Sequence, residues 1–169
     1  SSAINYTMLS AGSAINPGAL GTSAIALPGT VTLDNTYGAA SGTKASGYIT
    51  ASNASTLATA SIGVTMDDAI FASGHIVVNG ATGGSSIAGI SYSVGITSTA
   101  GNVTFNGSAT NGLGVYNVGA STITANNITI DGTTSLAPNW ATFIGTLTIN
   151  SGSAGGNIAV TGNVINTPG

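Results

Sequence analysis

Short runs of apolar, mostly β-branched residues, often alternating with threonine, constrain this fold more than any other feature of the sequence. Such runs occur at residues 31–33, 76–78, 103–105, 128–130, 147–149 and 158–160. A period of two places alternate side chains on opposite faces of a strand. A helix needs about ten residues of period 3.6 with good helix formers. Only short helices at 54–60 or 67–72 remain open, so the chain is expected to be all-β.

A weak internal repeat accompanies these runs. The pattern apolar-x-apolar-polar-Gly begins at Ile76, Val103, Ile128 and Ile158, and these starts are 27, 25 and 30 residues apart. Turn signals follow at Asn79-Gly80, Asn106-Gly107, Asn111-Gly112 and Asp131-Gly132. Each repeat is therefore either a hairpin of a two-sheet sandwich or one coil of a β-solenoid. The unequal spacing favours an Ig-like, pilin-like β-sandwich, and the β-solenoid is the alternative.

The chain is polar but almost uncharged. It has one lysine, Lys44, no arginine, four aspartates, one histidine and no cysteine. One permanent cation cannot neutralise a row of phosphates, which argues against a nucleic-acid partner. No apolar run reaches the 18 or so residues of a membrane-spanning helix. The chain starts at Ser1-Ser2-Ala3 without a leader-like segment, and we interpret it as a secreted, extracellular protein whose signal peptide has been removed.

The amino-terminal segment is expected to be an amphipathic strand. Ile4, Tyr6 and Met8 alternate with polar residues, and Asn16-Pro17-Gly18 then indicates a joint. We predict a tail over residues 1–12 and a single β domain over 13–169. A sandwich that lacks a strand exposes an edge, which the tail of a neighbouring copy can fill. Alternatively, the segment is the first strand of its own domain.

With this tail and composition, the chain resembles donor-strand-complemented filament subunits. The nearest types are the thread subunits of thermoacidophilic archaea and, more distantly, the type 1 pilins of chaperone–usher systems. The resemblance implies a head-to-tail homopolymer on the cell surface, with Ile4, Tyr6 and Met8 as donor residues, serving adhesion, cell–cell contact or biofilm formation. The chain departs from the pilins because it has no cysteine.

A second resemblance supports the solenoid alternative. Gly101-Asn102-Val103-Thr104 is similar to the strands of large secreted haemagglutinin-type adhesins. That likeness implies a binding or stalk module rather than a polymer subunit.

Candidate chemical sites are few. Five sequons for N-linked glycans occur at Asn5, Asn53, Asn102, Asn106 and Asn127. Asp67, Asp68 and His75 form the only cluster that resembles a metal or catalytic site. A metal needs three or four converging ligands, so a solvated turn explains the two aspartates better. We therefore expect no enzyme activity, no metal and no cofactor.

Overall fold

The computed structural model describes residues 4–36, 62–83, 88–117, 119–135, 141–144, 147–151 and 156–164. In these ranges the chain is all-β, with no helix, which confirms the predicted class. The largest sheet has six strands, and β1 and β14 lie at its two edges. In spatial order, its strands are β1 (Tyr6–Leu9), β2 (Val31–Asp34), β5 (Ile76–Thr82), β8 (Val103–Ala109), β11 (Ile128–Thr134) and β14 (Ile158–Val164).

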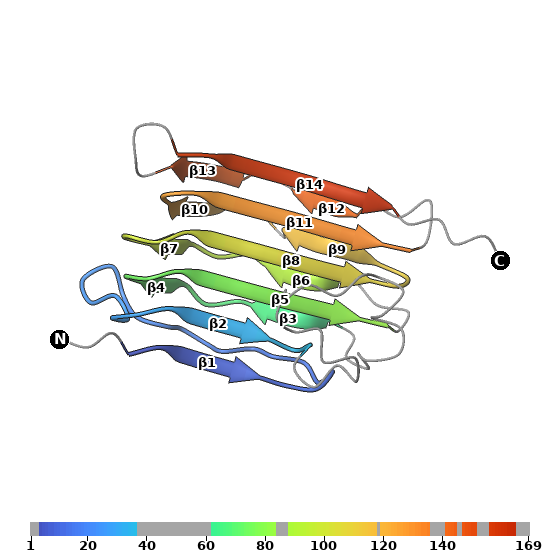
Figure 1. Ribbon diagram of the computed structural model, residues 1–169, viewed down its shortest axis with the longest axis horizontal. Coiled ribbons are helices and arrows are strands. Elements are labelled where there is room, and N and C mark those ends of the chain that lie inside the picture. Colours follow the sequence, from blue (N-terminus) through green and yellow to red (C-terminus); the bar gives the residue numbers. More distant parts are fainter. Residues whose placement is uncertain are drawn as a thin grey trace.

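Two four-stranded sheets complete the described part of the molecule. One contains β3 (Ile62–Met66), β6 (Ala88–Tyr92), β9 (Leu113–Asn117) and β12 (Thr142–Ile144). The other contains β4 (Ile70–Ala72), β7 (Ile96–Ser98), β10 (Ser121–Ala125) and β13 (Leu147–Ser151). The chain visits the three sheets in turn, and each circuit stacks on the previous one (Figure 1). The architecture is a β-solenoid.

The repeat found in the sequence is the repeat of this stack. Ile76 pairs with Val103, Val103 with Ile128, and Ile128 with Ile158. All pairings between the named strands are parallel, whereas a sandwich built of hairpins needs antiparallel ones. The favoured Ig-like sandwich is therefore not confirmed, and the β-solenoid alternative is. The unequal repeat lengths misled the prediction because the extra residues lie between strands and leave the register of the strands unchanged.

The core consists of columns of inward-facing side chains, one from each coil. Two such columns run through the six-stranded sheet and are fully buried in its four central strands. They are Val31, Ile76, Val103 and Ile128, and Leu33, Val78, Phe105 and Ile130. Burial of each side chain contributes roughly 1.5–3 kcal/mol. The Tyr92 ring meets the Phe105 ring edge to face, with centroids 5.2 Å apart.

Three of the predicted turns are strand interiors. Gly80, Gly107 and Gly132 lie in β5, β8 and β11, paired in register. These glycines let the six-stranded sheet approach the backbone of β6, β9 and β12: a Cβ placed on Gly89 of β6 would lie 2.6 Å from the Gly80 carbonyl oxygen. The turn interpretation was wrong because the same dipeptide also serves close packing of two backbones. Asn111-Gly112 does lie in a bend between β8 and β9.

The remaining predicted elements have mixed outcomes. The helix considered at 67–72 is instead a bend followed by β4, and the one at 54–60 lies outside the described residues. Residues 4–30 form the first coil. β1 pairs with β2, and Ile15, Leu20 and Leu27 make isolated parallel bridges to β3 and β4.

Candidate functional site

The outer face of the six-stranded sheet carries three columns of side chains. We name them by their residues, in order from β1 to β14. The threonine column is Thr7, Thr32, Val77, Thr104, Thr129 and Ala159. The acid–amide column is Leu9, Asp34, Asn79, Asn106, Asp131 and Thr161. The asparagine column immediately precedes the strands and is Asn5, Thr30, His75, Asn102, Asn127 and Asn157.

The asparagine column is tied together by side chains that accept hydrogen bonds from the next coil. The backbone N–H of Asn127 donates to Asn102 Oδ1 at 3.2 Å, and that of Asn157 donates to Asn127 Oδ1 at 2.9 Å. The Thr30 N–H donates in the same way to Asn5 Oδ1 at 3.1 Å. In the middle of the column, His75 Nδ1 takes the place of an amide oxygen and accepts the Asn102 N–H at 3.1 Å.

The acid–amide column is linked side chain to side chain. Asn79 Nδ2 donates to Asp34 Oδ2 at 3.4 Å, and Asn106 Nδ2 donates to Asn79 Oδ1 at 2.9 Å. At the far end, Thr161 Oγ1 donates to Asp131 Oδ1 at 2.7 Å. Asp34 is buried, and its other carboxylate oxygen accepts the Thr36 N–H at 2.7 Å. Both columns therefore fix the outer face of the sheet through direct hydrogen bonds between protein groups.

The threonine column lies between these two and differs from them. Thr7 and Thr129 are exposed, and Thr32, Val77 and Thr104 are half-buried. Within the described ranges, the hydroxyls of these threonines make no hydrogen bond to the protein. The column therefore presents unused hydroxyls and methyl groups on a rigid support.

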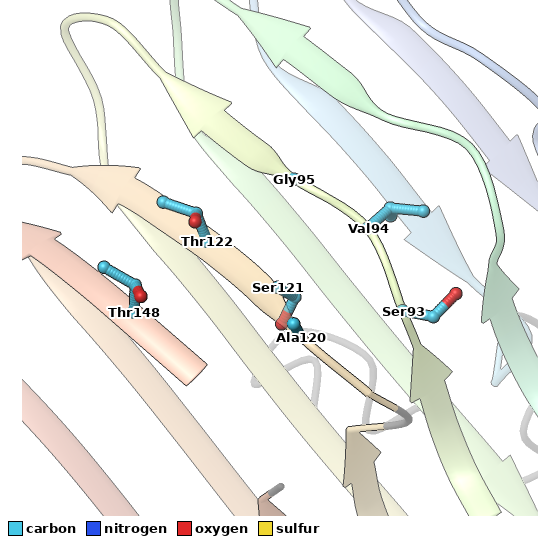
Figure 2. Close-up of a pocket in the computed structure, with 7 residues that line it drawn as sticks. All are labelled: Ser93, Val94, Gly95, Ala120, Ser121, Thr122 and Thr148. Carbon is cyan, nitrogen blue, oxygen red and sulfur yellow. The ribbon is translucent and has the colours of Figure 1, made fainter. Parts of the chain in front are cut away.

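A shallow hollow of about 260 Å³ lies on the sheet that contains β7, β10 and β13. It is lined by Ser93, Val94, Gly95, Ala120, Ser121, Thr122 and Thr148. Thr122 and Thr148 pair on neighbouring strands and point the same way (Figure 2). The hollow has hydroxyls but no charged or aromatic lining residue, so it offers no acid, base or nucleophile activated by a partner.

The two edge strands of the six-stranded sheet, β1 and β14, each have a strand partner on one side only among the described residues. All seven residues of β14 are exposed, and Ile158, Val160 and Val164 keep 44–47% of their surface in contact with solvent. β1 pairs only with β2. Neither strand contains a charged residue or a proline, the residues that usually discourage pairing at an edge.

The predicted donor residues lie at one of these edges. Tyr6 and Met8 are half-buried and pack against the core of their own chain, and Ile4 is 69% exposed. The Tyr6 N–H donates to the Thr30 carbonyl at 2.9 Å. In the structure this segment is thus the first strand of its own solenoid; its role between subunits stays a prediction.

The predicted glycosylation sites differ in how their amides are used. The glycan would join Nδ2. Asn5 is exposed and uses only its Oδ1 in the column. Asn106 and Asn127 donate through Nδ2, to Asn79 and Asn102 respectively. Asn102 is half-buried, and Asn53 lies outside the described residues. All five sites stay predictions, and Asn5 is the most accessible of the four that are described.

The two aspartates and the histidine of the suspected metal or catalytic cluster belong to different parts of the structure. Asp67 and Asp68 are exposed in the bend before β4, and Asn16 Nδ2 donates to Asp67 Oδ2 at 3.2 Å. His75 belongs to the asparagine column. Among the described residues, no group of three or more His, Asp or Glu side chains could hold a metal ion.

One buried hydroxyl stands out in the core. The Tyr92 hydroxyl has no hydrogen-bond partner among the described residues, and burial raises the pKa of this phenol well above its usual value. Neighbouring Asn117 donates through Nδ2 to the Tyr92 carbonyl and to Ser121 Oγ. These hydrogen bonds connect the end of β9 to β6 and to the start of β10, and of these residues Ser121 also lines the hollow.

The columns were not foreseen from the sequence, although their signal is present. An asparagine precedes three of the period-two runs, at Asn102, Asn127 and Asn157, and an Asn or Asp follows at the fourth strand position. Asn102 and Asn127 were interpreted as sequons, and the Asn-Gly and Asp-Gly pairs at the fourth strand position were interpreted as turns. Only a parallel stack turns residues one repeat apart into direct neighbours.

Comparison with known proteins gives no assignment: no protein-family model, curated protein or solved structure matches this chain. Within the part of the chain that is described, no helix is long and apolar enough to cross a membrane.

Proposed function

We propose that this chain is a structural β-solenoid module of an extracellular adhesin or stalk, of the secreted haemagglutinin type. The observation that carries the proposal is the in-register parallel stack, whose outer face is held by the asparagine and acid–amide columns. Such a stack behaves as a nearly one-dimensional rod whose coils support one another. The near absence of charge, including acid–base groups for catalysis, supports a structural role over an enzymatic one.

Single-molecule pulling through the two ends tests the mechanical part of this proposal. Because each coil contacts mainly its neighbours, the extension should increase in steps of about one coil, which is 25–30 residues for most coils and 45 residues from β2 to β5. Unfolding of the whole chain in one step would contradict a stalk made of separable coils.

A cell-surface filament subunit is the second candidate function. The observation that favours it is the exposed, uncharged β14 edge, to which another strand could add. In this version a tail containing Ile4, Tyr6 and Met8 leaves its own β2 and pairs with a neighbour, giving a head-to-tail homopolymer for adhesion, cell–cell contact or biofilm formation.

Electron microscopy and sedimentation of the full chain and of a chain lacking residues 1–11 separate the two candidates. A filament subunit forms fibres that the deletion abolishes. A stalk module stays monomeric in both forms. The glycan proposal is checked separately by intact mass, since the unmodified chain weighs 16.1 kDa.

A further inference from the structure

We propose that the outer face of the six-stranded sheet binds ice through the threonine column. The column offers a hydroxyl and a methyl group from each of Thr7, Thr32, Thr104 and Thr129, on in-register parallel strands. This inference goes beyond the structural role. If the amino-terminal strand pairs with a neighbouring copy, Thr7 leaves the column, and Thr32, Thr104 and Thr129 remain on their own sheet.

The spacing of the column suits a crystalline partner. Neighbouring strands lie about 4.7–4.9 Å apart, and outward residues two apart on one strand are separated by roughly 6.6 Å. The strand-to-strand spacing is close to one repeat of the oxygen atoms on a prism face of ice, and it is in this direction that the threonine hydroxyls follow one another, because the outward positions two residues away belong to the other two columns. The strands of the sheet run nearly parallel to one another (Figure 1), so this spacing persists from β1 to β11.

The chemistry of the face also suits ice better than other partners. Ice is neutral, and the threonine column has no charged member. The charges beside it are engaged: Asp34 is buried, and Asp131 accepts a hydrogen bond from Thr161. The three columns contain no Phe, Tyr or Trp ring on which a sugar could stack, and the one imidazole, that of His75, accepts the Asn102 N–H in the asparagine column. A permanent cation, which an acidic partner would require, is likewise missing from them.

The outer face of the six-stranded sheet is already ordered before a ligand binds. Within each of the two flanking columns, side-chain amides hydrogen-bond to one another. Asn106 Nδ2 donates to Asn79 Oδ1 at 2.9 Å in the acid–amide column, and Asn127 Nδ2 donates to Asn102 Oδ1 at 2.9 Å in the asparagine column. The intervening threonine hydroxyls remain available to water. Ordering such a surface costs little at binding, because its strands are already fixed.

Val77 provides a direct test because it interrupts the column. Valine has the shape of threonine but lacks the hydroxyl, and its neighbours in the column are Thr32 and Thr104. If the hydroxyls organise ice-like water, Val77→Thr completes a run of five threonines and should strengthen adsorption. Thr104→Tyr places a bulky ring on the face and should weaken adsorption at least tenfold.

The probe is ice itself, in an adsorption assay on polycrystalline ice and in an assay of ice recrystallisation. Thr124→Tyr is the matched control, since Thr124 lies on β10 in a different sheet. Circular dichroism melting identifies any variant that fails to fold, and Thr104→Val, which keeps the shape, supplies a second loss-of-hydroxyl variant.

The proposal expects the full chain to adsorb to ice, Val77→Thr to increase adsorption, Thr104→Tyr and Thr104→Val to decrease it, and Thr124→Tyr to leave it unchanged. Failure of the folded chain to adsorb overturns the proposal. It is equally overturned if Thr124→Tyr has the larger effect, or if the chain adsorbs to insoluble polysaccharide but not to ice.

Discussion

At the scale of single residues, Tyr92 shows how burial in the core affects a polar group. Its hydroxyl is buried without a partner among the described residues, and burial raises the pKa of the phenol because the charged form is poorly solvated there. The unfolded chain releases this proton near pH 10, whereas the folded chain retains it. The stability associated with Tyr92 is therefore complete below pH 10 and falls as the pH rises above that value.

We expect Tyr92→Phe to raise the free energy of unfolding by about 1 kcal/mol at pH 7, because it removes an unsatisfied buried hydroxyl. The variant should also lose less stability between pH 9 and 11 than the parent chain. Urea denaturation at these pH values measures both effects. Tyr6→Phe, at a half-buried position, is the control, and an equal effect there would contradict the explanation.

The asparagine column makes a second prediction at this scale. Asn102 Oδ1 accepts hydrogen bonds from both the N–H and the Nδ2 of Asn127, so Asn102→Ala leaves two donors without their acceptor. The expected loss is about 1–3 kcal/mol in denaturant unfolding. Asn157→Ala is the matched control at the end of the column, where Asn157 only donates its N–H. Equal losses at the two positions would contradict the column.

At the scale of strands, close approach of two backbones limits which residues fit. A Cβ on Gly89 of β6 would lie 2.6 Å from the Gly80 oxygen and 2.6 Å from both the Ser108 nitrogen and oxygen. Gly89→Ala should therefore cost about 3 kcal/mol or prevent folding. Gly95→Ala is the control, since its nearest contact would be 3.9 Å away, and it should change stability by less than about 1 kcal/mol. Thermal melts that rank the two variants in the opposite order would contradict this packing.

The strands themselves were predictable, but their partners were not. The alternation at 103–105 and 128–130 identified β8 and β11, because burial of one face imposes a period of two. The repeat starts at Ile76, Val103 and Ile128 were also found, and they proved to be one column. Local sequence could not distinguish a hairpin from a coil, because Asn-Gly suits both a tight turn and a close contact between sheets.

The candidate site was predicted less completely than the fold. Asn5, Asn102, Asn106 and Asn127 were singled out as sequons, but their membership of two hydrogen-bonded columns was not foreseen. No single strand sequence indicated the threonine column, because threonine is common in β-strands. Its significance arises only from parallel stacking.

At the scale of the whole molecule, the account depends on a parallel stack in which each coil adds one strand to the six-stranded sheet. This arrangement places Thr7 and Thr129 four strand spacings apart on the same face, about 19 Å along the stack. Because the chain has no cysteine, spin labels can be attached cleanly at chosen positions.

The most direct test is the distance between spin labels on cysteines that replace Thr7 and Thr129, measured by pulsed electron paramagnetic resonance. A second pair, at Thr7 and Thr104, is one strand closer. The solenoid predicts two narrow distributions that differ by about 5 Å, with the Thr129 pair the longer. Equal distances, or a shorter distance for the Thr129 pair, would contradict the stacked architecture.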